Sequence, residues 1–380
     1  MINFFPHPTT QLTVYKKEKN TPTYKKMIRN NLKWIMIALL ALFALSSILP
    51  MVSDMGNGCQ ADQPVVNVIE TKSLPDIPIP QFNSDSAYIF TEKIVSFGPR
   101  VVGTSGATKV KKYVVSQFKQ YGAEVIEQPF KANTYDGKTH AATNIVARYN
   151  LQATNRVVLS AHWDTRPFAD KDPDPAFKDK PILGADDSGS AMGMLLEMAR
   201  QLQHTPLSNL GVDIVLFDAE DYGNPAAAKT EEEERRQNLT WCLGSQYWSK
   251  NLPSANYMAK YGINLDMAGA KGARFTKELI SMQYAAPVVE KVWRVAREKY
   301  GYVGLFVDEA SKGPMIDDHL FVNQIAKIPM IDIINHPPDS YFGRYWHTHN
   351  DDMSVVDKET LRSVGQTVLA VLHFENMGAF

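Results

Sequence analysis

VVLSAHWD at residues 157–164 and VDIVLFDAED at residues 212–221 are short apolar runs that end in acidic residues. Runs of this length are typical of buried strands. Between them, GSAMGMLLEMARQL at residues 189–202 repeats its apolar residues at three- and four-residue spacing, as in Met192, Leu195, Leu196 and Ala199, which predicts an amphipathic helix. A strand, a helix and a strand in this order are typical of a parallel sheet covered by helices.

The same alternation extends in both directions along the chain. Towards the amino terminus the pattern predicts helices at 87–96 and 107–121 and strands at 123–130 and 143–149. Towards the carboxyl terminus it predicts strands at 263–267 and 328–334 and helices at 283–300 and 359–374. We therefore expect one α/β domain over residues 86–380, with a central, mostly parallel mixed sheet flanked by helices.

Polar residues gather where the expected strands end. In open α/β sheets, ligands bind outside the carboxyl ends of the strands, so these side chains should meet at one edge. Imidazole and carboxylate groups are zinc ligands where no thiol is offered. The sequence therefore predicts a zinc site at this edge, drawn from His162, Asp164, Asp186, Asp187, Glu220, Asp221, Asp266, His347 and His349.

Each of these residues alone has a simpler explanation. A single Asp at a strand end usually caps a helix or faces water, and Asp186 is well placed to cap the helix at 189–202. A lone His is usually structural. Independent caps at the end of every successive strand would be a coincidence, so the recurrence favours a metal site.

Composition excludes several classes of protein. The 380 residues are 44% hydrophobic and 21% charged, which are globular values, and the net charge is −1. A near-neutral chain without a basic stripe is not expected to bind nucleic acid. Its two cysteines, Cys59 and Cys242, exclude a cysteine-rich metal site.

The first 85 residues are expected to lie outside the catalytic domain. Residues 1–33 form a basic segment, predicted to be cytoplasmic, before the uncharged apolar run at 34–52, and Asp54 follows; this order predicts export of the remaining chain. The run's length fits a transmembrane anchor or a signal h-region, with a buried core helix as the alternative. Met27 offers a second start, and Cys59 is a weak site for lipidation. Residues 53–85 are Pro-rich and polar, which predicts a linker.

Two charged stretches are expected to be surface loops. EEEERR at residues 231–236 predicts a mobile, solvated loop. The aspartates of DKDPDPAFKDK at residues 170–180 suggest a loop over the site, with a calcium site as an alternative. Trp163, Trp241 and Trp248 are expected to be packing residues.

Several motifs together resemble the zinc aminopeptidase family and, within it, the bacterial glutaminyl cyclases (glutaminyl-peptide cyclotransferases). The resemblance covers residues 86–380. Its segments are LSAHWDTRPFAD, LGADDSGSAMGMLLEMARQL, VLFDAEDYG, NLDMAGA, MIDDHLF and WHT.

The resemblance implies roles for individual residues. Asp187, Asp221 and His347 would hold one zinc ion per chain, although Asp221 stands where the animal cyclases have Glu. Glu220 would be the general acid/base. Further residues implied in catalysis or substrate binding are Asp266 and Asp317, as a carboxylate network, Trp346, as a pocket wall, and Asp332, where the animal enzymes have His.

Two further aromatic residues follow from the sequence itself. Tyr341 and Phe342 precede Trp346 in a loop, and exposed loop aromatics often mark binding surfaces. We expect them to form the pocket rim. Closely spaced Glu220, Asp266 and Asp317 would repel one another, so we also expect them to share a proton.

The activity implied by the resemblance is cyclisation of an amino-terminal glutamine to pyroglutamate with release of ammonia. The expected partners are peptides or proteins with amino-terminal glutamine, and the inner membrane through the amino-terminal segment. The expected location is the periplasmic side of a Gram-negative inner membrane, anchored, lipidated or released after signal cleavage.

Two other functions remain open at this point. A two-zinc aminopeptidase would use His162, Asp187, Asp221, Asp266 and His347 as ligands. Against it stand Asp317 and Trp346, which suit a narrow pocket for one glutamine side chain. A non-catalytic peptide-binding relative is the third alternative, but it would have no reason to keep Glu220 beside the metal.

Overall fold

The computed structural model describes residues 73–380. The predicted cytoplasmic segment (1–33), the apolar run (34–52) and most of the predicted linker lie outside the described residues, as do Met27 and Cys59. Within residues 73–380, no helix is both long enough and apolar enough to span a membrane.

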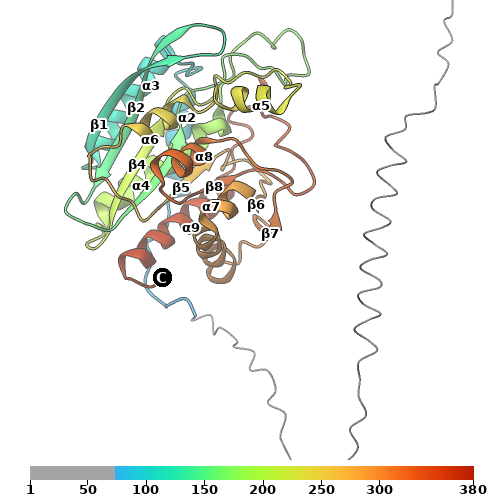
Figure 1. Ribbon diagram of the computed structural model, residues 1–380. Coiled ribbons are helices and arrows are strands. Elements are labelled where there is room, and N and C mark those ends of the chain that lie inside the picture. Colours follow the sequence, from blue (N-terminus) through green and yellow to red (C-terminus); the bar gives the residue numbers. More distant parts are fainter. Residues whose placement is uncertain (1–72) are drawn as a thin grey trace, which may run out of the picture. The chain divides into compact units, whose positions relative to one another are not determined.

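A six-stranded mixed sheet forms the centre of the domain (Figure 1), in the order β1-β2-β4-β3-β5-β8. Strands β4, β3, β5 and β8 are mutually parallel, whereas β2 runs antiparallel to both β1 and β4. The predicted α/β domain with a mostly parallel mixed sheet is confirmed. The strands are β1 (Glu124–Asn133), β2 (Thr139–Tyr149), β3 (Arg156–His162), β4 (Gly211–Phe217), β5 (Tyr261–Asp266) and β8 (Met330–Ile334).

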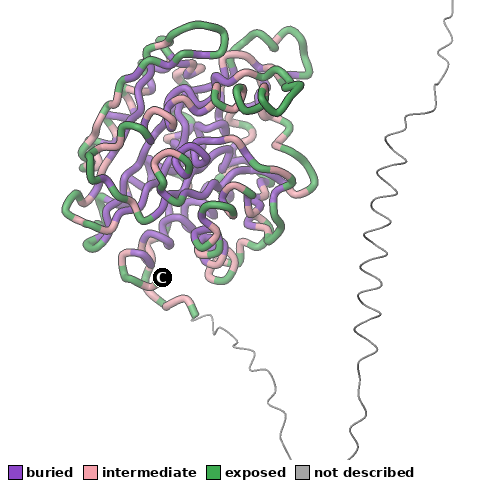
Figure 2. Tube along the Cα trace, in the orientation of Figure 1, coloured by how far each residue is buried: buried purple, intermediate pink, exposed green. Residues whose placement is uncertain are grey.

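Both faces of the sheet are covered, and the alternation of side chains along β3 shows how. Val157, Leu159 and Ala161 belong to the larger hydrophobic core, whereas Val158 belongs to a second core on the opposite face. Successive strand residues point to opposite faces, so a strand buried on both sides is apolar over most of its length. Figure 2 shows the buried residues concentrated in the centre of the domain.

Helices form the outer layers of the domain. The larger core is covered by α2 (Ser84–Val95), α3 (Ser105–Gln120), α4 (Ala191–His204), α7 (Leu279–Arg294) and α9 (Lys358–Asn376). On the other face lie α6 (Leu243–Lys250), α8 (Asp318–Phe321) and the irregular turn η3 (Val322–Ala326). Apart from α5 (Glu231–Asn238), the remaining elements are η1 (Ala185–Ser190), η2 (Val295–Lys299) and the small parallel pair β6 (Phe275–Lys277) and β7 (Phe306–Ala310).

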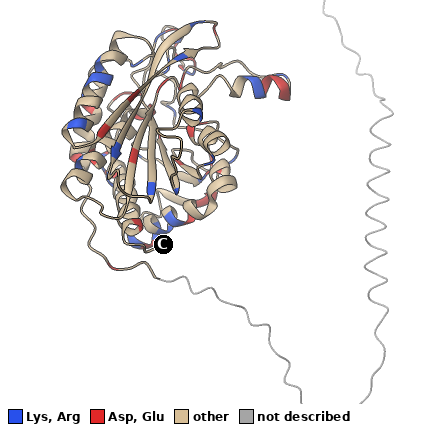
Figure 3. Cartoon of the chain, turned by 60° about the vertical axis from the view of Figure 1, so that its left-hand side comes forward, with Lys and Arg blue, Asp and Glu red and all other residues tan. Residues whose placement is uncertain are grey.

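The charged stretch at 231–236 is helical, so the prediction of a mobile loop was wrong. Helix α5 (Glu231–Asn238) begins after Thr230, whose side chain accepts a hydrogen bond from the Glu233 backbone N–H. Its glutamates lie in the first turn and its arginines in the last, an order that suits the helix dipole. Figure 3 shows this charged helix projecting from the edge of the domain.

The end of the predicted linker packs onto the domain. Phe82 is 1% exposed, and its backbone N–H donates to Gln366 Oε1 of α9 at 2.8 Å. Asn83 caps α2 by accepting a hydrogen bond from the Ser86 backbone N–H. The folded part of the chain therefore includes residues ahead of α2.

Candidate active site

The parallel strands bring the predicted polar residues to one edge of the sheet. His162 is the last residue of β3, and Asp266 is the last residue of β5. Glu220 and Asp221 follow the end of β4, while Asp187 comes from η1, ahead of α4. Since parallel strands end at the same edge, elements far apart in sequence supply one cluster.

Asp187, Asp221 and His347 form one buried group that could hold a metal. One ligand atom from each lies within 4.8 Å of the others. His347 Nε2 is 3.2 Å from Asp221 Oδ1 and 3.9 Å from Asp187 Oδ2. Asp221 Oδ2 is buried without a hydrogen-bond partner among the described residues. Two carboxylates, one imidazole and an unsatisfied buried oxygen fit the ligand preferences of zinc.

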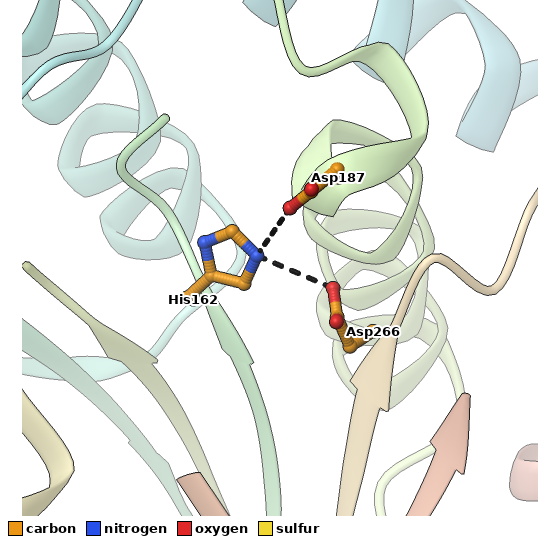
Figure 4. A group of neighbouring side chains, drawn as sticks. All are labelled: His162, Asp187 and Asp266. Carbon is orange, nitrogen blue, oxygen red and sulfur yellow. Dashed lines mark hydrogen bonds and ion pairs between the residues drawn. The ribbon is translucent and has the colours of Figure 1, made fainter. Parts of the chain in front are cut away.

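A second group shares Asp187 with the first (Figure 4). His162 Nε2 lies 2.9 Å from Asp187 Oδ1 and 3.2 Å from Asp266 Oδ1. The carboxylates of Asp164, Asp187 and Asp266 outweigh burial and raise the pKa of His162 well above its usual value. Burial raises the pKa of Asp266 to about 7, although the hydrogen bond with His162 opposes this shift. The second group could hold either a shared proton or a second metal.

Glu220 lies in a third group, with Cys242 and Asp317. The Cys242 thiol donates to Glu220 Oε1 at 3.2 Å. Burial raises the pKa of Glu220 well above its usual range, and the charges of Asp221 and Asp317 raise it further, whereas His162 lowers it. A carboxyl group with such a raised pKa is suited to both accepting and donating a proton.

Asp332 lies behind Asp317 and does not line the cavity. It is 1% exposed, and the Asn264 amide donates to Asp317 Oδ2 and to Asp332 Oδ1, each at 3.3 Å. Burial raises the pKa of Asp332 well above its usual value, with the neighbouring Asp317 adding to the shift. Asp332 can therefore reach a substrate only through this network.

Residues from all three groups line a cavity of about 310 Å³. Trp346, Phe342 and Tyr341 form an aromatic wall; the Phe342 and Trp346 ring centroids are 4.6 Å apart. The cavity has acidic and apolar sides, which suits a small polar side chain on a peptide. Its walls include Asp187, Glu220, Asp221, Glu234, Asn238, Trp241, Asp266, Met315, Asp317, Tyr341, Phe342, Trp346 and His347.

Two buried aspartates hold the turns that carry the candidate ligands. The Asp186 and Asp187 backbone N–H groups donate to the two carboxylate oxygens of Asp351, at 2.8 and 3.1 Å. The Glu220 and Asp221 backbone N–H groups donate in the same way to Asp164, at 3.0 and 3.2 Å. Asp164 was predicted at the site from its place after β3, whereas Asp351 was not, because it carries no strand-end signal.

The structure separates other predicted residues from the cluster. Asp186 accepts hydrogen bonds from Ser190 Oγ and the Gly269 backbone N–H. His349 Nδ1 lies 2.6 Å from Asp172, and its ring stacks on Phe177. No described group that could hold a metal includes a residue of 170–180.

The three tryptophans that were expected to be packing residues have different environments. Trp163 and Trp248 are core residues, 2% and 0% exposed. Trp241 instead lines the cavity, and its ring lies parallel to that of His347, with centroids 6.3 Å apart. The interpretation of Trp241 as a packing residue was therefore wrong. No spacing signal distinguishes it from Trp248, because its position depends on the turn after α5.

Residues 144–372 match peptidase family M28, and the chain belongs to this family. Within it, the resemblance to bacterial glutaminyl cyclases is confirmed. The chain is 42% identical to the Bacteroides thetaiotaomicron glutaminyl cyclase crystallised with N-acetylhistamine; the match covers 78% of this chain and 99% of that one, with a TM-score of 0.74.

Other relatives include both a peptidase and a further cyclotransferase. The chain is also 45% identical in sequence to a Zn-dependent exopeptidase from Parabacteroides distasonis. The match to its crystal structure covers 78% of this chain and 99% of that chain, with a TM-score of 0.73. The glutaminyl-peptide cyclotransferase of Drosophila melanogaster is 28% identical over 282 residues, 69% of this chain and 73% of that protein. The names of the relatives alone therefore do not decide between cyclisation and peptide hydrolysis.

Proposed function

We propose that this protein is a zinc-dependent glutaminyl-peptide cyclotransferase. The observation that carries this proposal is the shared cavity: a candidate metal group, a buried Glu220 and an aromatic wall face the same space. Similarity to bacterial glutaminyl cyclases supports it. The substrates would be peptides or proteins with an amino-terminal glutamine.

Asp187, Asp221 and His347 would hold one zinc ion per chain. Bound there, zinc would supply Lewis-acid polarisation of the substrate γ-carbonyl. Cyclisation forms a bond between the α-amine nitrogen and the γ-carbonyl carbon, breaks the bond from that carbon to the amide nitrogen and releases ammonia. Glu220 would take a proton from the α-amine and transfer it to the departing amide nitrogen.

The other residues of the cavity would position the substrate. Asp266 and Asp317 present carboxylates that can accept hydrogen bonds from the amine and the amide, and Asn264 and Asp332 hold Asp317 in place. Trp346 and Phe342 would pack on the glutamine side chain and exclude water, with Tyr341 at the rim. Holding the amine and the carbonyl in one geometry would accelerate ring closure, because the entropic cost of bringing the reacting atoms together is already met on binding.

A two-zinc aminopeptidase is the second candidate function, because His162, Asp187 and Asp266 form a further group that could hold a metal. Metal analysis of the purified protein, paired with an ammonia assay, separates the two. The proposal predicts one zinc ion per chain and zinc-dependent release of ammonia from a peptide with amino-terminal glutamine. Two ions per chain together with release of free amino acids would contradict it.

The location is also a proposal. The basic residues at 1–33 and the apolar run at 34–52 support attachment to, or export across, the inner membrane, with the catalytic domain on the periplasmic side. Fractionating cells and treating spheroplasts with protease tests this. Protection of the catalytic domain in intact spheroplasts would contradict it.

A further inference from the structure

Arg166 is a fully buried cation next to the candidate metal group, and the proposed mechanism does not use it. It follows β3 in the loop that leaves the site, and it is 0% exposed. Burying a guanidinium group is unfavourable unless its hydrogen bonds are satisfied by well-placed partners. The groups that contact the Arg166 guanidinium therefore indicate its role in the site.

The guanidinium group binds two different segments of the site. Arg166 Nη1 donates to the Asp221 carbonyl oxygen at 3.0 Å and lies 3.4 Å from Asp221 Oδ1. Arg166 Nε donates to Asp170 Oδ1 at 2.7 Å, and the same oxygen lies 3.2 Å from His347 Nδ1. One planar group thus connects Asp221 directly and His347 through Asp170.

Aromatic rings fix the plane of this group. The guanidinium carbon lies 4.5 Å from the centroid of Phe168 and 4.7 Å from that of Trp241. Trp241 in turn lies parallel to the His347 ring. Arg166 and His347 are therefore also related through a tryptophan in the cavity wall.

We propose that Arg166 is a positioning residue that presets two of the three proposed zinc ligands, Asp221 and His347. The inference rests on the zinc site of the proposed function. A histidine ligand is oriented by the carboxylate bound to its other ring nitrogen, and such supporting contacts strengthen metal binding. Asp170 Oδ1 faces His347 Nδ1 at 3.2 Å, an ion-pair distance without hydrogen-bond geometry. Arg166 holds Asp170 and Asp221 in a single arrangement in which this carboxylate can orient the His347 ring.

One feature argues against a purely structural role. Arg166 Nη2 is buried without a hydrogen-bond partner among the described residues, which is unfavourable for folding. The contacts to Asp170 and Asp221 use two separate nitrogens of one planar group, which a lysine ammonium does not reproduce.

A matched control exists at the start of β3, the strand that precedes the Arg166 loop. Arg156, the first residue of β3, is also buried and forms a fork with Asp213, at 3.0 and 2.6 Å. It has no contact with the site residues. Arg156→Lys therefore reproduces the loss of a buried Arg–Asp fork without touching the proposed ligands.

The test is a zinc-affinity measurement by chelator competition on the full-length protein, with circular dichroism to verify folding. Arg166→Met should weaken zinc binding about 10- to 100-fold, the range typical of supporting contacts. Arg166→Lys should weaken it less, and Arg156→Lys should leave it unchanged. Equal zinc affinity in wild type, Arg166→Lys and Arg166→Met would overturn the inference.

Asp170→Asn keeps the test decisive if Arg166→Met fails to fold. It leaves an acceptor oxygen but removes the carboxylate that His347 Nδ1 faces, so it should also weaken zinc binding. Because Arg166 acts on His347 through Asp170, the double variant Arg166→Lys/Asp170→Asn should lose less affinity than the two single losses combined. Strictly additive losses would count against this connection. Absence of zinc binding by wild type would instead refute the proposed metal site itself.

Discussion

Glu220 is the residue on which the proposed chemistry depends most. It is 8% exposed, its backbone N–H is held by Asp164, and its carboxyl group accepts a hydrogen bond from Cys242. These contacts fix the carboxyl group beside the candidate metal group without using both of its oxygens. The proposed role of Glu220 is thus separable from metal binding.

Glu220→Gln should lower kcat by about 10²- to 10⁴-fold, because glutamine has a similar shape but cannot transfer the proton. Zinc content should remain that of wild type, since the proposed ligands are untouched. Steady-state kinetics with metal analysis checks both points. A variant that keeps wild-type kcat would remove Glu220 from the mechanism.

Asp317→Asn tests whether the carboxylates of the cavity act together. Asp317 contributes to the raised pKa of both Glu220 and Asp266, so removing its charge should lower the apparent pKa of the group. The acid side of the pH–rate profile should move to lower pH, because Glu220 and Asp266 would ionise more readily. A profile identical to that of wild type would contradict proton sharing.

Helices α2 and α4 approach each other closely at a glycine. A Cβ at Gly193 would lie 2.6 Å from the Ala87 carbonyl oxygen and would also clash with Thr91 Oγ1. Gly193→Ala should therefore lower the free energy of unfolding by about 1–3 kcal/mol, as overpacking usually does. Urea denaturation of wild type and Gly193→Ala measures whether the variant is less or more stable. Helix propensity alone would favour Ala by about 1 kcal/mol, so increased stability would contradict this packing argument.

A buried hydrogen bond joins the start of α7 to α8. Glu278 Oε2 lies 3.0 Å from His319 Nε2 and accepts hydrogen bonds from Ser281. Burial opposes ionisation of Glu278, but His319 and the backbone N–H groups of Ile280 and Met315 lower its pKa to about 2. This shift from 4.5 corresponds to roughly 3 kcal/mol of stability.

The contribution of Glu278 should depend on pH in one direction. Because the pKa of Glu278 is lowered in the folded state, its contribution to the free energy of unfolding is complete above pH 4.5. This contribution is lost as the pH falls towards 2. The difference in unfolding free energy between wild type and Glu278→Gln should therefore narrow by about 1 kcal/mol between pH 6 and pH 3.5. A difference that stays constant or widens would contradict the lowered pKa. Urea titrations at the two pH values measure it.

The long periodic elements were predictable from the sequence, and the short ones were not. The helix expected at 359–374 corresponds to α9, because its apolar residues define a helical period. The run at 157–162 corresponds to β3, because a short continuous apolar run is typical of a buried strand. Helix α8 has four residues and β6 has three, too few for any period. The α5 sequence lacks an apolar face, and only its capping Thr230 and ordered charges indicate a helix.

At the scale of the whole molecule, the strand order explains which site residues the sequence could predict. Residues at strand ends, such as His162 and Asp266, could be placed together because parallel strands end at one edge. Asp351, Trp241 and Glu234 reach the site from loops or from α5. Nothing in the strand–helix alternation places these segments, so they could be located only in the structure.

The most direct test of the account is the product formed from a peptide with an amino-terminal glutamine. The zinc-loaded, full-length protein would be incubated with such a peptide and the product analysed by mass spectrometry. The account predicts loss of one ammonia with every residue retained, and no such product from Glu220→Gln. A peptide shortened by one residue, with free glutamine released, would contradict it and would favour the two-metal arrangement around His162, Asp187 and Asp266.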